Sequence, residues 1–244
     1  MCGRYTLIAN AEAIRLLFEV PAFDERLVVP RYNIAPTQPV VVVRENPKGR
    51  ELLPMRWGLI PWWAKDPKNL PLMINARAEQ VAEKPAFRDA FKYRRCLVPA
   101  SGFYEWETRE RGPKKPFAAM PKNPLIAFAG LWETWHGPDG SEIDTATIVT
   151  TGANAYLRPI HDRMPVVLGQ EDFSAWLSRD TDPADAQALL KPAPEDLFQL
   201  VPVSTRVNSA DNDDPTLLER DDSEPQEVTG LKPAKADPRQ MRLL

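Results

Sequence analysis

The sequence predicts an α+β fold with a dominant antiparallel, barrel-like β-sheet core and short peripheral helices. β-prone runs separated by turn signals occupy the middle of the chain, and helical periodicity is confined to short segments. The chain also holds 26 prolines among 244 residues. So many prolines imply rigid, irregular connections, which argues against a doubly wound α/β fold with long helices.

The first elements are a short strand and a helix. Residues 4–8 are β-prone, and Asn10 is placed to cap a helix over Ala11–Glu19. Apolar residues at helical spacing support this helix, and Pro21 ends it. A loop containing Pro30 and Pro36 follows.

The β-structure begins with a hairpin. Its strands are Val40–Arg44 and Glu51–Trp57, and its turn is Asn46–Gly49. After a loop to Asn75, Ala78–Tyr93 is predicted to be a helix broken at Pro85. Further β-prone runs are Cys96–Glu107 with a bulge or bend at Pro99 and Gly102, Pro116–Met120, Pro124–Trp135 and Ile143–Thr151.

The remaining segments complete one domain. Residues 152–162 are expected to form a short helix or turn, Val166–Leu168 and Phe198–Val203 strands, and Glu171–Arg179 and Pro183–Leu190 amphipathic helices. We expect a single domain over residues 2–220. Residues 221–244 are rich in Asp, Glu, Pro, Lys and Gln, which predicts a disordered tail.

Composition excludes several classes of protein. No apolar run of 18 residues and no signal-peptide core is present, so we expect a cytoplasmic protein without a membrane partner. Two cysteines do not make a disulfide framework, and two histidines without CxxC or HExxH spacing do not match a zinc site. Residues 1–170 carry a positive surplus, whereas 171–228 are strongly acidic. Only the first part therefore has the charge for a basic groove, although a solvated surface explains the same counts.

Cys2 is the residue with the most distinctive potential chemistry. A small side chain at position 2 permits removal of Met1, after which Cys2 carries a free amine and a thiol on adjacent carbons. The reference pKa values, about 8 for the amine and about 8.5 for the thiol, leave part of each group reactive near neutral pH. A cysteine at position 2 often has no function, so the rest of the chain must support this chemistry.

Two other residues are candidates for proton transfer. Alternation along 102–107 places Phe103, Glu105 and Glu107 on one face of a strand, so Glu105 either faces water or lies beside apolar surface with a raised pKa. His161 lies between two prolines and is either a held proton carrier or a hydrogen-bonded loop histidine.

Two stretches suit a nucleic-acid ligand. Asn75 and Arg77 offer an amide and a guanidinium for a sugar oxygen and a phosphate, although Asn75 is also a common helix cap. Trp62 and Trp63, followed by Lys65 and Lys68, show the aromatic and basic pattern that stacks on bases. A purely structural role for the tryptophans fits equally.

Seven motifs in one order resemble the SOS response-associated peptidase (SRAP) family, the abasic site processing proteins. The motifs are Met1–Tyr5, Arg31–Pro36, Trp57-Gly58 with Pro61–Trp63, Ile74–Glu79, Arg95–Pro99 with Gly102–Trp106, Ile148–Thr150 with His161–Pro165, and Pro202–Ser204. The resemblance covers essentially residues 2 to 220. Each motif alone is weak, but their common order is specific.

The resemblance implies covalent capture of abasic sites in single-stranded DNA. Cys2 would form a thiazolidine with the sugar aldehyde, Glu105 and His161 would transfer protons, and Asn75 would hold the sugar oxygen. The same site would remove Met1 as a peptidase, and no cofactor or metal would be needed. Residues expected to contact DNA are Arg4, Asn33, Trp62, Trp63, Arg77, Trp106, Thr150, Arg163 and Ser204.

The implied partners are single-stranded DNA with abasic sites and single-strand/duplex junctions, with the replication machinery as a further candidate. The protein is expected to be a monomer that joins the nucleoid when bound to DNA. Two other functions fit parts of the sequence. One is an amidase that uses the Cys2 amine as its base, and the other is a single-stranded DNA-binding module in which Cys2 is incidental.

Overall fold

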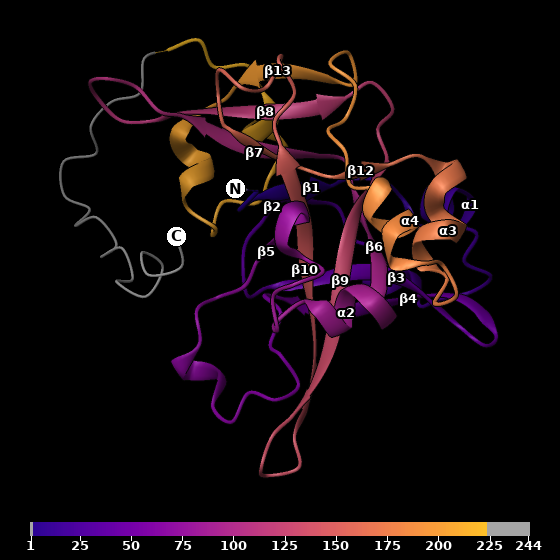
Figure 1. Cartoon of the computed structure of the whole chain (residues 1–244). Helices are drawn as coiled ribbons and strands as arrows, with labels where there is room; N and C mark the ends of the chain where they lie inside the picture. Colours follow the sequence, from indigo (N-terminus) through magenta and orange to yellow (C-terminus); the bar gives the residue numbers. More distant parts are fainter. Residues whose placement is uncertain (1, 224–244) are drawn as a thin grey trace.

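The computed structural model describes residues 2–223 and contains two β-sheets with short helices beside them (Figure 1). Five strands of the eight-stranded sheet close into a ring, since each pairs with the next and the last pairs with the first. In order around the ring they are β3 (Pro39–Asn46), β4 (Gly49–Trp57), β10 (Glu142–Gly152), β9 (Ile126–His136) and β6 (Arg95–Ala100). The expected barrel-like core is therefore confirmed.

Three short strands extend the sheet that contains the barrel. β5 (Asn75–Arg77) and β11 (Arg163–Pro165) pair with β10, and β12 (Val167–Leu168) pairs with β9. The pairings of β10 with β4 and with β5 are parallel, and all others are antiparallel. The sheets are thus dominantly antiparallel, with β10 as the exception.

The second sheet has five antiparallel strands and lies above the barrel in the view of Figure 1. Its order is β13 (Phe198–Pro202), β8 (Lys115–Pro121), β7 (Gly102–Glu107), β1 (Tyr5–Leu7) and β2 (Arg31–Ile34). The strand β1, which directly follows Cys2 and its neighbours, is held between β7 and β2.

The sequence Cys96–Glu107 forms two strands, one in each sheet. β6 ends at Ala100 and β7 begins at Gly102, so the expected bend at Gly102 carries the chain from the barrel to the second sheet. A Cβ atom at Gly102 would lie 2.8 Å from the carbonyl oxygen of Ala119, too close for any other residue. The bend places Phe103 and Glu105 next to β1.

Aromatic side chains join the two sheets. The ring of Tyr5 lies edge-on to those of Trp57 and Phe128, at 5.3 and 6.1 Å between centroids, and Phe103 also packs edge-on against Phe128. All four side chains are buried. Burial of each contributes about 2 to 3 kcal/mol, so the start of the chain is fixed against the barrel.

The helices are short. They are α1 (Ala11–Phe18), α2 (Arg88–Tyr93), α3 (Phe173–Leu177) and α4 (Pro183–Ala188), with short 3-10 helices at Glu25–Leu27, Pro67–Asn69, Ala78–Gln80, Gln170–Asp172, Thr205–Asn208 and Pro215–Leu218. Asn10 caps α1 as expected, because its Oδ1 accepts from the backbone N–H of Ala13 at 2.8 Å. Within residues 2–223, no helix is both long and apolar enough to cross a membrane.

Two strands lie where loops are expected from the sequence. Arg31–Ile34 forms β2 and Asn75–Arg77 forms β5. Both are too short to show alternation, and each forms because a distant strand supplies its hydrogen bonds. The expected tail lies mostly outside the described residues, which end at position 223.

Candidate active site

Cys2 is fully buried and lies just before β1, which begins at Tyr5. Its Sγ lies 3.9 Å from the carbonyl oxygen of Arg4, and that oxygen accepts from the N–H of Tyr104 at 3.0 Å. Burial raises the pKa of the Cys2 thiol well above its ordinary value, and the negative charge of Glu105 raises it further. The sulfur is therefore a neutral thiol beside an acid–base group.

Glu105 lies on the buried face of β7. Phe103 shares that face, and the side chains of Tyr104 and Trp106 pack in a separate cluster on the other face, so the expected alternation is confirmed. Glu105 is 3% exposed, whereas Glu107 is partly exposed, so the interpretation that both face water is wrong for Glu105. Burial raises the pKa of Glu105 from 4.5 to about 7. Both of its protonation states are then populated near neutral pH.

His161 reaches the same site from the loop before β11. Its Nε2 lies 3.9 Å from Glu105 Oε2, and its Nδ1 accepts from the backbone N–H of Arg163 at 2.9 Å. Burial lowers the pKa of the imidazole, so the ring is neutral near pH 7. Nδ1 also lies 3.0 Å from Asp162 Oδ1, so the ring is held at its Nδ1 side while Nε2 faces Glu105.

Asn75 presents an acceptor rather than a donor. Its Nδ2 faces two backbone carbonyls, those of Ile74 at 2.9 Å and Ile148 at 3.5 Å. Its Oδ1 is buried and has no hydrogen-bond partner among the described residues. Trp57 donates to the Ile74 carbonyl at 2.9 Å and packs on Tyr5, which links β5 to β1. Asn75 is not a helix cap, since it lies within β5.

The arginine at position 163 is held by an acidic partner. Its two terminal nitrogens bind the two carboxylate oxygens of Glu79 at 2.8 and 2.9 Å, and one also donates to the Thr150 carbonyl at 2.6 Å. The buried Nε of Arg163 has no hydrogen-bond partner among residues 2–223. Thr150 is fully buried and stands opposite Arg77 in the pairing of β10 with β5. Arg77 is partly exposed, and its side chain makes no hydrogen bond or ion pair with residues 2–223.

Arg4 and Asn33 bind the segment that follows β13. Arg4 donates to Asn33 Oδ1 at 2.9 Å and to the carbonyls of Val207 and Asn208 at 2.8 and 3.0 Å. Asn33 is fully buried, and its Nδ2 donates to three carbonyls between positions 207 and 212. Both side chains thus stabilise this segment in the fold, and Asn33 has no surface to offer DNA.

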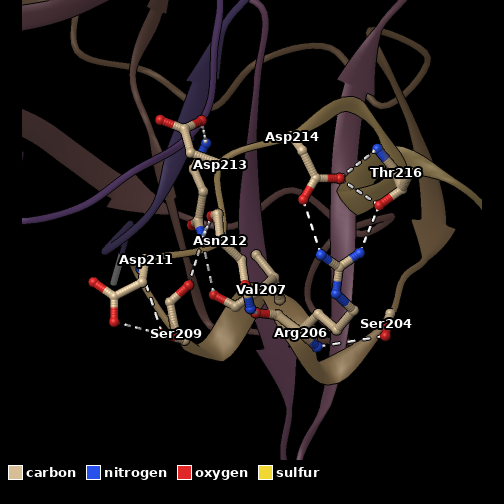
Figure 2. A network of polar contacts seen from close by, with 10 residues as sticks. Ser204, Arg206, Val207, Ser209, Asp211, Asn212, Asp213, Asp214 and Thr216 are labelled. Atoms are coloured by element: carbon tan, nitrogen blue, oxygen red, sulfur yellow. Dashed lines mark hydrogen bonds and ion pairs between the residues drawn. The ribbon is translucent and has the colours of Figure 1, made fainter.

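Two further expected contact residues involve residues 203–216, since Ser204 lies in this segment and Trp106 of β7 binds it. Ser204 accepts from the N–H of Arg206 at 3.4 Å, and Arg206 in turn binds Asp214 at 2.9 Å (Figure 2). Trp106 donates to Asn208 Oδ1 at 2.8 Å. Asp213 accepts from the backbone N–H of Asn33 at 3.0 Å and binds Arg31. Sequence reasoning missed Asp213 and Asn208, whose partners are far away in the chain.

Trp62 and Trp63 are exposed, at 57% and 44%. They lie in the loop after Leu59 and Ile60. Glu79, the last residue of the Ile74–Glu79 motif, is the carboxylate partner of Arg163. Among residues 2–223 no group of three or more His, Cys, Asp or Glu side chains is arranged to hold a metal ion.

The sequence is similar to known proteins over most of its length. The family model described as SOS response associated peptidase (SRAP) matches residues 1–210. The abasic site processing protein YoqW of Bacillus subtilis is 43% identical over 222 residues, covering 90% of this chain and 99% of that protein. The abasic site processing protein HMCES of Gallus gallus is 34% identical, and the match covers 78% of this chain and 66% of the HMCES chain.

A solved structure of a protein from Bacteroides thetaiotaomicron superposes with a TM-score of 0.81 at 25% identity, covering 90% of this chain and all of that one. A second solved structure, of a protein from Bordetella bronchiseptica, superposes with a TM-score of 0.72 at 26% identity. The match covers 83% of this chain and all of the Bordetella chain. The fold and the sequence therefore support the same assignment. The chain belongs to the SOS response associated peptidase (SRAP) family.

Proposed function

We propose that this protein processes abasic sites in DNA by binding them covalently through Cys2. Relatives named abasic site processing proteins support the lesion as the substrate. The observation that carries the covalent step is the burial of the Cys2 thiol beside Glu105, whose pKa of about 7 suits proton transfer at neutral pH.

The reaction requires a free amine on Cys2. We propose that Met1 is removed by the protein itself, with Cys2 as the nucleophile and Glu105 as proton donor or base. Hydrolysis of the Met1–Cys2 peptide bond consumes one water and releases methionine. The product is the 1,2-aminothiol on which the later steps depend.

Capture begins with opening of the abasic sugar. The closed hemiacetal must lose its hydroxyl proton and gain one on the ring oxygen to become an aldehyde, and Glu105 with neutral His161 is placed to exchange these protons. The buried Oδ1 of Asn75 is an acceptor for a sugar hydroxyl or for the Cys2 amine. This refines the expected role of Asn75, because its amide nitrogen is already bound to backbone carbonyls.

The covalent product forms in two additions. The Cys2 amine adds to the aldehyde carbon, and loss of water, with a proton supplied by Glu105, gives an imine. The thiol then adds to the same carbon and its proton passes to nitrogen, which closes a five-membered thiazolidine. Because the thiol is tethered to the amine, its effective concentration is on the order of 10⁵ M or more. The ring persists where a simple imine hydrolyses.

We assign the DNA path to groups that remain available at the surface. Arg77 would hold a flanking phosphate, and exposed Trp62 and Trp63 would stack on bases and stop the duplex. The terminal nitrogens of Arg163 would join Arg77 where a phosphate competes with Glu79 for them. Trp106, Thr150 and Ser204 would support this path. Arg4 and Asn33 would act indirectly, by holding residues 207–212 against β1 and β2.

One experiment tests this proposal directly. The purified protein is mixed with a single-stranded oligonucleotide that contains one abasic site, and the products are separated after heating in SDS. We expect a stable adduct with the wild type and none with Cys2→Ala. Absence of the adduct from the wild type contradicts covalent capture and leaves a non-covalent DNA-binding module, whereas hydrolysis of small amides by the same protein would support the amidase.

A further inference from the structure

His161 ends a turn whose backbone is held on both sides. The N–H groups of Ile160 and His161 donate to the carbonyl of Leu157, at 2.9 and 3.1 Å, and the side chain of Leu157 is buried. The carbonyl of Asp162 accepts from the N–H of Ala153 at 2.9 Å, directly after the end of β10. The backbone beside the imidazole is therefore fixed without the help of the Asp162 side chain.

The nitrogen Nδ1 of His161 faces two groups that require opposite states of it. The backbone N–H of Arg163, at 2.9 Å, can donate only to an unprotonated Nδ1. The Oδ1 atom of Asp162, at 3.0 Å, can accept only from a protonated Nδ1. One ring nitrogen satisfies one of these groups at a time, so the two contacts favour different protonation states of the ring.

Proton exchange at Nε2 requires one of these two states. A ring that gives up its Nε2 proton must keep a proton on Nδ1, because an imidazole without any proton does not form near neutral pH. A neutral ring that takes a proton at Nε2 carries its first proton on Nδ1. In both directions Nδ1 is protonated, and this is the state that Asp162 stabilises.

The charges around His161 act in both directions. Burial and the positive charge of the chain's amino terminus lower the pKa of the imidazole, and Lys114 lowers it further, whereas the carboxylate of Asp162 raises it. On the other side of the ring, Glu105 Oε2 lies 3.9 Å from Nε2. The side chain of Glu105 is buried, whereas that of Asp162 is 85% exposed. Asp162 is thus the carboxylate partner of the ring that solvent can reach.

We propose that Asp162 is a positioning residue for capture, which holds a proton on Nδ1 of His161 so that Nε2 can exchange protons with Glu105 and the abasic sugar. The proposal rests on the proposed function, because it concerns the same proton transfers. No bond is made or broken at Asp162. The proton on Nδ1 stays on the ring while a second proton arrives at Nε2 or leaves it, as in other sites where a carboxylate fixes the tautomer of a catalytic imidazole.

The first test measures the ring itself by NMR. His136 and His161 are the two histidines of the chain, so their ring signals are readily assigned. Asp162→Asn keeps the size of the side chain and removes its charge. We expect it to lower the pKa of His161 by about half a pH unit, as suits an exposed partner. The ¹⁵N shifts of the neutral ring should also move toward the tautomer with its proton on Nε2.

The other histidine supplies a matched control. His136 Nε2 lies 2.6 Å from Glu142 Oε1, and both side chains are exposed. Glu142→Gln should therefore change the titration curve of His136 and leave the signals of His161 and the rate of capture unchanged.

The second test measures capture. With a single-stranded oligonucleotide that contains one abasic site, Asp162→Asn should slow adduct formation about tenfold, a part of the 10²- to 10⁴-fold that general acid–base catalysis contributes. Asp162→Ala also removes the acceptor and should be slower still, whereas Asp162→Glu keeps the charge and should restore most of the rate. The Kd for an oligonucleotide with a reduced abasic residue should not rise in Asp162→Asn, because the variant has lost a negative charge.

Two results overturn the proposal. One is an unchanged His161 titration in Asp162→Asn under conditions where Glu142→Gln alters that of His136. The other is a capture rate that Asp162→Asn leaves at the wild-type value, or that Asp162→Glu fails to restore. Absence of the adduct from the wild type would instead contradict the proposed function, while the NMR titration still decides whether Asp162 holds the Nδ1 proton.

Discussion

His161 Nε2 lies 3.9 Å from Glu105 Oε2, while Nδ1 of the same ring accepts from the backbone N–H of Arg163 at 2.9 Å. The two residues come from different sheets, since Glu105 is in β7 of the second sheet and His161 precedes β11 of the barrel sheet. Their arrangement brings a carboxyl group with a raised pKa to a neutral imidazole, next to the Cys2 thiol. The predictions about catalysis follow from this pair.

Glu105→Gln should slow capture far more than it weakens DNA binding. The amide keeps the size of the side chain but cannot accept or release a proton, and general acid–base catalysis contributes about 10²- to 10⁴-fold. The rate of adduct formation at saturating DNA is compared with the Kd for a reduced abasic oligonucleotide. An equal loss in both would assign Glu105 to DNA binding.

The same substitution should change how stability depends on pH. Because burial raises the pKa of Glu105 from 4.5 to about 7, the folded protein holds a proton that the unfolded chain releases between these values. The contribution of Glu105 to the free energy of unfolding is fully present below pH 4.5. It is lost as the pH rises toward 7, by about 3 kcal/mol in total. The free energy of unfolding is measured in urea at pH 5 and pH 8. Relative to the wild type, Glu105→Gln should be more stable at pH 8 than it is at pH 5. A constant difference between the two proteins would contradict the raised pKa.

Cys2→Ser should separate the two additions of the proposed reaction. Because Cys2 is the proposed nucleophile for removal of Met1, the serine variant is first treated with a methionine aminopeptidase, and loss of Met1 is checked by intact mass. It then keeps the amine but lacks the thiol, so it can form the imine without the thiazolidine. We expect its adduct to be lost on heating in SDS and retained when borohydride first reduces the imine. A heat-stable adduct without borohydride would show that the thiol is dispensable.

Arg4 and Arg77 should behave differently although both are candidates for phosphate contact. Arg4→Gln removes three internal hydrogen bonds and should lower stability by roughly 2 to 3 kcal/mol with little change in the salt slope. Arg77→Gln should leave stability nearly unchanged and reduce the slope by about one. Urea unfolding and salt-dependent binding measure the two effects. An intact fold with a reduced slope for Arg4→Gln would restore its direct role.

Local signals in the sequence predicted the parts of the fold that neighbouring residues determine. The Asn10 cap, the β3–β4 hairpin, the bend at Gly102 and the alternation of Phe103 and Glu105 each depend on residues a few positions apart. The strand β2, in contrast, depends on pairing with β1, and no local pattern indicates a partner so far away.

The same distinction holds at the site. Four candidate residues could be chosen from the sequence because their side chains are nucleophilic, titratable or polar: Cys2, Glu105, His161 and Asn75. The family resemblance assigns them to one reaction. The internal partners of Arg4 and Asn33 are mainly backbone carbonyls at positions 207–212, which have no signature in the sequence. For the same reason the resemblance implied a DNA contact for Arg4, where the fold supplies internal partners.

Glu79→Gln should tighten DNA binding. The carboxylate of Glu79 is 53% exposed and neutralises Arg163, which is only 15% exposed, by contacts at both of its oxygens. A phosphate that approaches Arg163 must compete with this charge, and the amide keeps the shape of the side chain without it. We expect a lower Kd and a salt slope steeper by up to about one. Stability should fall by no more than about 1 kcal/mol, because the pair is partly exposed. Glu83→Gln, an exposed acidic residue of the same segment, is the control and should change neither quantity. Weaker binding by Glu79→Gln would show instead that the carboxylate is needed to orient Arg163 toward the DNA.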